Sequence, residues 1–181
     1  MSNQFLIDKE FSRKYEEYFA SILEKEEYKT INDSGDAIIL QNTCELNDGL
    51  RNDGGCDIFQ KLTNEKGDVQ GIRRIDVKCY RAPKFKKYFD GVFIETYLPL
   101  SNNPGWFYDE SKNTTHYLFA INCSDKELKF DEAWLIDKNT LKWLVKKATK
   151  NDDIVEKKIT SAHGFILPYG YLREEGEKIV D

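Results

Sequence analysis

The feature that most constrains the fold is a pair of predicted β-strands separated by a short polar turn. Residues 56–62 and 71–80 are both predicted to be strands, and residues 64–68 (Asn-Glu-Lys-Gly-Asp) form the turn between them. Two β-rich runs around a short glycine-containing turn are typical of an antiparallel hairpin. We therefore expect such a hairpin near the centre of the chain.

Helices are predicted on both sides of this strand-rich centre. Residues 8–27 carry apolar side chains at i, i+3, i+4 and i+7 spacing, which predicts an amphipathic helix. A second helix is expected over 140–149, with Asn139 as its N-cap. Further strands are expected over 37–41, 92–98, 116–123 and 133–137, and a packed apolar segment over 164–172. This order predicts an α+β (mixed α/β) class, with a central mixed β-sheet flanked by helices in one domain spanning 1–181.

Composition excludes several classes of protein. With 181 residues, of which 40% are hydrophobic and 33% charged, the chain is expected to be globular rather than disordered. No apolar run approaches the ~18 residues of a transmembrane helix, and the N-terminus lacks a signal-peptide pattern. The four cysteines are scattered and form no Cys-x-x-Cys pair. We therefore expect a cytoplasmic protein with free thiols and no membrane contact.

The charge distribution bears on nucleic-acid binding. The net charge of −5 argues against binding by the whole surface, because non-specific DNA binders carry a basic excess. A local basic cluster, with aromatic residues interleaved, lies just after the second strand of the hairpin. It consists of Arg81, Lys84, Lys86 and Lys87. Such a basic face on an acidic body can dock a phosphate backbone, and the alternative is a solvated surface.

Three residues of the hairpin carry the chemistry. Asp57 follows a Gly-Gly pair at the start of the first strand, while Asp76 and Lys78 are two residues apart in the second and so project from one face. Two carboxylates on adjacent strands make an oxygen-rich site for Mg²⁺, and a lysine beside them can position or deprotonate a metal-activated water. Two plainer interpretations stay open: Asp57 as an ordinary turn residue, and Asp76 with Lys78 as an exposed ion pair.

The pattern of a leading helix, an Asp at a strand start and Asp-x-Lys on the partner strand resembles the PD-(D/E)xK nuclease superfamily. That superfamily includes restriction endonucleases, Holliday-junction resolvases and many phage-encoded nucleases. The resemblance implies a restriction endonuclease-like core, in which Asp57 and Asp76 bind Mg²⁺ (or Mn²⁺) and Lys78 is catalytic. The family's helix pattern, E-x-x-(apolar)-(small)-x-x-L, fits residues 16–23 and adds Glu16 as a catalytic carboxylate. Cys56 stands where the family pattern has proline.

The resemblance predicts a metal-dependent DNA endonuclease, and because such nucleases commonly dimerise it also implies a homodimer. The alternative is a catalytically inactive nuclease-like subunit that binds DNA or protein in a phage, restriction or repair system. An acidic DNA mimic is disfavoured by the lysine clusters. Glu95 is either an additional acid near the metal or a solvent-facing strand residue, and the strand pattern favours the second. Trp106 is expected to be a core or turn anchor rather than a platform on which a base stacks.

Overall fold

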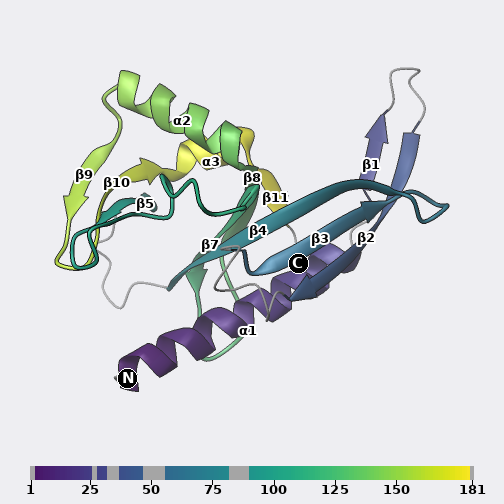
Figure 1. Cartoon of the computed structure of the whole chain (residues 1–181), viewed down its shortest axis with the longest axis horizontal. Helices are drawn as coiled ribbons and strands as arrows, with labels where there is room; N and C mark the ends of the chain where they lie inside the picture. The colour runs from purple at the N-terminus through teal and green to yellow at the C-terminus, as the bar shows by residue number, and fades with distance from the viewer. Residues whose placement is uncertain (1–2, 26–27, 32–36, 47–55, 82–89, 180–181) are drawn as a thin grey trace.

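The computed structural model describes residues 3–25, 28–31, 37–46, 56–81 and 90–179 (Figure 1). Within these ranges seven strands form one sheet, in the spatial order β1-β2-β3-β4-β7-β8-β11. The strands are β1 (Tyr28–Ile31), β2 (Ala37–Leu46), β3 (Ile58–Thr63), β4 (Val69–Arg81), β7 (His116–Cys123), β8 (Glu132–Asp137) and β11 (Glu177–Ile179). Strands β4 and β7 run parallel and the other neighbours are antiparallel, so the predicted mixed sheet and α+β class are confirmed.

The predicted hairpin is formed by β3 and β4. Ile58 pairs with Ile75, and the ladder continues to the turn. In the turn, the side chain of Asn64 accepts hydrogen bonds from the N–H groups of Lys66 and Asp68, and Gly67 has a φ of 83°, a conformation that glycine adopts without strain. The turn chemistry visible in the sequence therefore closes the hairpin, and the pairing shifts register between Leu62 and Thr63 before it reaches the strand residues that carry the site.

Helix α1 (Asn3–Lys25) covers one face of the sheet, as predicted, and begins five residues before the expected start at residue 8. Its fully buried side chains are Tyr15, Phe19 and Leu23, and they lie in one cluster with Ile58 and Ile75 of the hairpin. Burying each large apolar side chain contributes about 1.5–3 kcal/mol. Alternation along β4 places Ile75 on this face and its neighbours on the opposite one.

The opposite face of β7 and β8 is covered by α2 (Lys138–Lys150), α3 (Tyr169–Glu175) and a second sheet (Figure 1). Asp137, the last residue of β8, caps α2 by accepting hydrogen bonds from the N–H groups of Asn139 (2.8 Å) and Thr140 (3.1 Å). The prediction of Asn139 as the N-cap was wrong because the helix begins directly after the strand, where a capping carboxylate is already present.

The second sheet has four strands among the described residues, in the order β6-β5-β10-β9. They are β6 (Asn103–Pro104), β5 (Gly91–Leu98), β10 (His163–Pro168) and β9 (Val155–Lys158). The strand predicted over 92–98 therefore exists, but it pairs with β10, which is the first half of the predicted apolar segment over 164–172. Gly164 permits this pairing, because an added Cβ would lie 2.1 Å from the carbonyl oxygen of Ile94. In the part of the chain that the structure describes, no helix is long and apolar enough to cross a membrane.

Candidate active site

Asp57 is held against β4 by two hydrogen bonds. Its N–H donates to the carbonyl of Ile75 and its Oδ2 accepts the N–H of Val77, each over 2.8 Å. At this position the carboxylate of Asp57, rather than a backbone carbonyl, accepts the hydrogen bond from the β4 backbone. Since Ile58 pairs with Ile75, Asp57 is held beside Asp76. Asp57 is thus an anchored residue at the strand end rather than an ordinary turn residue.

Asp76 and Lys78 form an ion pair on the same face of β4. The Nζ of Lys78 lies 2.8 Å from Oδ1 of Asp76. Asp76 is only 5% exposed, and its second carboxylate oxygen, Oδ2, is buried with no hydrogen-bond partner in the described part of the chain. The interpretation of the two as an exposed strand-face pair is therefore wrong. A buried carboxylate oxygen with no donor is costly, so a cation or a donor that reached it would be stabilising.

The charges of the site act on one another. The pKa of Asp57 is raised to about 7, first by burial and then by the negative charges of Asp76 and Glu16. Burial lowers the pKa of Lys78, but the charge and hydrogen bond of Asp76, with the charges of Asp57 and Glu95, outweigh burial and leave that pKa above its ordinary value. Asp57 therefore experiences excess negative charge, and Lys78 carries a firmly held positive one.

Glu16 lies on α1 and is only 5% exposed. The structure brings it close enough to Asp57 for its charge to raise the pKa of that carboxyl. The same charge also raises the pKa of Cys79, after larger effects of Cys123 and of burial. The helix pattern therefore identified a carboxylate that lies beside the site. The catalytic role of Glu16 stays a prediction.

Glu95 was expected to face solvent, and this expectation was wrong. It is partly buried in β5, its Oε1 accepts the N–H of Trp106 over 3.3 Å, and its charge acts on Lys78. Gly105 makes this approach possible, because an added Cβ would lie 2.5 Å from the carbonyl oxygen of Glu95. Trp106 is 8% exposed in the core, as predicted, and its ring centre lies 5.1 Å from Nζ of Lys78. The residue pattern of the strand predicted over 92–98 does not indicate that the loop containing Trp106 packs against Glu95.

The predicted basic cluster is described only at Arg81, since Lys84, Lys86 and Lys87 lie outside the described residues. The guanidinium of Arg81 bonds Asp8 of α1 (2.5 Å) and Asp125 (2.7 Å), and it lies 4.1 Å from the ring centre of Phe11. A phosphate would have to compete with two carboxylates for this side chain. Its contact with nucleic acid stays a prediction.

A divalent cation fits this site in part. In the described ranges, no group of three or more His, Cys, Asp and Glu side chains is arranged to hold a metal ion. Asp57 and Asp76 nevertheless supply neighbouring carboxylates, and Oδ2 of Asp76 lacks a partner. Mg²⁺ is often bound through one or two carboxylates, with water completing its coordination. These two residues are therefore the ones that would hold it.

No family model, no curated protein and no solved structure matches this chain. What the site can do chemically is therefore inferred only from the residues that form it.

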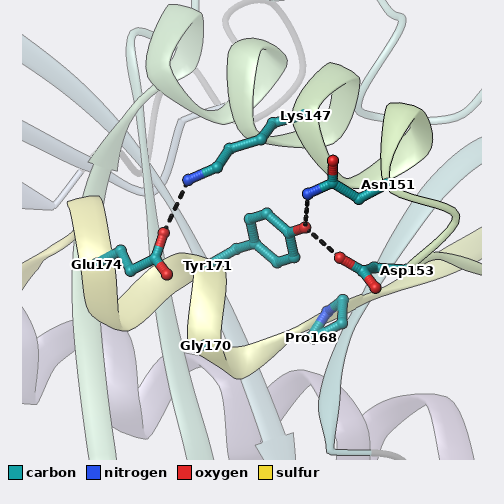
Figure 2. Close-up of a pocket in the computed structure, with 7 residues that line it drawn as sticks. All are labelled: Lys147, Asn151, Asp153, Pro168, Gly170, Tyr171 and Glu174. Atoms are coloured by element: carbon teal, nitrogen blue, oxygen red, sulfur yellow. Dashed lines mark hydrogen bonds and ion pairs between the residues drawn. The ribbon is translucent and has the colours of Figure 1, made fainter.

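A surface pocket of about 410 Å³ lies elsewhere, between the end of α2, β10 and α3 (Figure 2). Its polar groups bond one another: Lys147 pairs with Glu174 (2.9 Å), and the hydroxyl of Tyr171 donates to Asp153 (2.5 Å) and accepts from Asn151 (3.1 Å). The pocket contains none of the predicted site residues. These polar groups are therefore paired with one another, and the pocket provides no argument for function.

Proposed function

We propose that this chain is a metal-dependent DNA endonuclease of the PD-(D/E)xK type that hydrolyses phosphodiester bonds at Asp57, Asp76 and Lys78. The observation that carries the proposal is the arrangement of two carboxylates beside one ammonium group, with a buried Asp76 oxygen that has no partner among the residues that the structure describes. This combination suits a site that binds a divalent cation and a phosphate together.

Each residue has a role that follows from its surroundings. Asp57 and Asp76 would hold Mg²⁺, or Mn²⁺ in its place, and a bound cation supplies an acidified water and stabilises charge on the phosphate. Lys78 has a raised pKa and remains an ammonium at neutral pH. It therefore serves as a donor and counter-charge to the phosphate rather than as a general base. Glu16 adds negative charge next to Asp57 and is the further carboxylate of the proposed site.

DNA is the proposed substrate, and a homodimer in the cytoplasm is the proposed form of the protein. Two copies of a site that cuts one strand would allow both strands of a duplex to be cut. Sedimentation of the purified protein with and without duplex DNA tests the dimer.

The direct test is to incubate the purified protein with duplex, nicked, branched and single-stranded DNA, with Mg²⁺ or with EDTA. We expect cleavage with Mg²⁺ only. The variants Asp57→Asn, Asp76→Asn and Lys78→Met should each lose roughly 100-fold or more of the rate. Asp153→Asn and Lys147→Met, which make the same chemical changes at the pocket of Figure 2, serve as controls and should cleave normally. Intact DNA across the whole panel would contradict the proposal.

A second function is favoured by one observation. The ammonium of Lys78 is bonded directly to Asp76, so the ion pair already provides part of the charge that a metal would supply. A nuclease-like subunit that binds DNA or protein without cleaving it would have this arrangement. In the same panel, such a subunit would retain DNA or a partner protein while leaving every substrate intact with Mg²⁺ and with Mn²⁺.

A further inference from the structure

Arg74 differs from the other arginines that the structure describes. Its guanidinium has no carboxylate partner among the described residues, and it lies 5.7 Å from the ring centre of Phe59. The remaining described arginines all pair with carboxylates: Arg13 with Glu17, Arg73 with Glu177, Arg81 with Asp8 and Asp125, and Arg173 with Glu132. In a chain with a net charge of −5, an arginine left without a carboxylate is available to an external anion.

The position of Arg74 relates it to the proposed site. It precedes Asp76 by two residues on β4, so alternation places both side chains on one face, roughly 7 Å apart along the strand. Arg74 pairs across the hairpin with Phe59. Lys61, two residues further along β3, has its Nζ 5.8 Å from the same ring. We call Phe59, Lys61 and Arg74 the hairpin strip.

The strip lies on the face of the hairpin opposite α1. Helix α1 contacts β2, β3 and β4 on the face that contains Ile58 and Ile75. Helices α2 and α3 pack on β8 instead, and Figure 1 shows the β3–β4 hairpin extending away from them. Ile72, which pairs with Lys61, is 43% exposed. Phe59, Lys61 and Arg74 are each half-buried, so among the described residues the strip keeps part of its surface open to solvent beside the site.

We propose that the hairpin strip binds the sugar–phosphate backbone of a nucleic-acid strand and guides it into the site at Asp57, Asp76 and Lys78. This inference rests on the proposed function and names the surface that receives the substrate. The physical reason for this inference is electrostatic. The carboxylates of Glu16, Asp57, Asp76 and Glu95 repel a phosphate, so a strand can approach only where cations offset them.

The chemistry of the strip suits this ligand. A guanidinium forms charge-assisted, bidentate hydrogen bonds with phosphate oxygens. The spacing of roughly 7 Å between Arg74 and Asp76 is short enough for one strand to contact both positions. The ring of Phe59, which lies close to the cations of Lys61 and Arg74, adds apolar surface against which the sugar or base of a bound nucleotide can pack.

The test compares two adjacent arginines. Arg74→Gln and Arg73→Gln remove the same charge one residue apart, but Arg73 lies on the other face and pairs with Glu177. Binding of a fluorescent DNA oligonucleotide to the whole protein is measured by anisotropy in EDTA over a range of salt concentrations. We expect Arg74→Gln to weaken binding roughly three- to tenfold and to reduce the salt slope by about one. Arg73→Gln should change neither value, and Lys61→Gln should act in the same direction as Arg74→Gln.

Failure of the inference and failure of the proposed function give different results. Equal binding by Arg74→Gln and Arg73→Gln, or no binding by the wild type, would overturn the strip whether or not Mg²⁺ supports cleavage. Selective weakening in Arg74→Gln without any cleavage by the wild type would support the strip and overturn the endonuclease. Thermal melting of each variant checks folding, and Lys61→Gln decides the outcome if Arg74→Gln does not fold.

Discussion

The ammonium of Lys78 lies between two unlike partners: Oδ1 of Asp76 at 2.8 Å and the centre of the Trp106 ring at 5.1 Å. Trp106 is itself tied to Glu95 through its backbone N–H. The amine is therefore positioned by β4, by β5 and by the loop after β6. Such multiple support would hold Lys78 in place for the role proposed for it.

The first prediction concerns Glu95, whose negative charge raises the pKa of Lys78. Glu95→Gln should lower the pKa of Lys78, because it removes a nearby negative charge while the amide oxygen still accepts the N–H of Trp106. The pKa is measured by NMR titration of the Lys78 Cε signal, which is assigned with Lys78→Met. Glu110→Gln removes a carboxylate that pairs with Lys142 instead and is the control. An unchanged titration in Glu95→Gln would show that the Glu95 charge does not act on Lys78.

The second prediction concerns Asp57 and pH. Its pKa of about 7 in the folded protein lies above the value of about 4 expected when unfolded. Between these values the unfolded chain has lost a proton that the folded protein keeps, so this group reduces stability as pH rises from 4 to 7. Asp57→Asn keeps an acceptor for Val77 and removes the charge. The variant should gain stability over the wild type across this range, by up to a few kcal/mol. Urea unfolding in EDTA at several pH values measures it, and parallel wild-type and variant profiles would refute it.

The third prediction concerns His116 at the start of β7. Burial, with the charge of Arg73, lowers its pKa to about 4, although Asp137 acts in the opposite direction. Below pH 6.5 the unfolded imidazole binds a proton that the folded one does not. Stability should therefore fall as the pH drops from 6.5 to 4, by up to about 3 kcal/mol from this group. His116→Gln should flatten that part of the stability profile, as measured by urea unfolding. A variant profile as steep as that of the wild type would assign the acid sensitivity to other groups.

The fourth prediction concerns Arg81, which joins α1 to the end of β4. Its partners Asp8 and Asp125 are well exposed, so their ion pairs are screened by solvent. The packing of the guanidinium on Phe11 adds a cation–π contribution. Arg81→Gln should therefore reduce the free energy of unfolding by about 1 kcal/mol. Lys129→Gln, which removes a highly exposed ion pair with Glu127, is the control and should be close to neutral. Equal stability of the two variants would mean that Arg81 does not tie α1 to the sheet.

The sequence was sufficient to predict the parts of the site that depend on local rules. The turn at 64–68 and the strand pattern around it predicted the hairpin, and the period of two placed Asp76 and Lys78 on one face. The apolar spacing of α1 predicted the helix that covers the other face. These predictions succeeded because each depends on residues that are close in the sequence.

The parts that could not be predicted depend on contacts between distant segments. Glu95 reaches the site because β5 pairs with β10, about seventy residues later, and because Gly105 allows the following loop to lie against β5. Asp137 became a helix cap because α2 starts directly after β8. Arg74 differs from every other described arginine, because each of the others lies beside a carboxylate. Most of those carboxylates come from distant segments, so the sequence does not indicate the difference.

The most direct measurement is a calorimetric titration of the protein with Mn²⁺ at pH 7, repeated in buffers with different heats of ionisation. With a pKa of about 7, Asp57 carries a proton in about half of the molecules, and a bound cation would displace it. We predict one binding event per chain with the release of about half a proton. Binding should be lost in Asp76→Asn and weakened in Asp57→Asn, and the binding that remains in Asp57→Asn should release no proton. Absence of binding in the wild type, or equal binding and proton release in both variants, would contradict a metal site at these carboxylates.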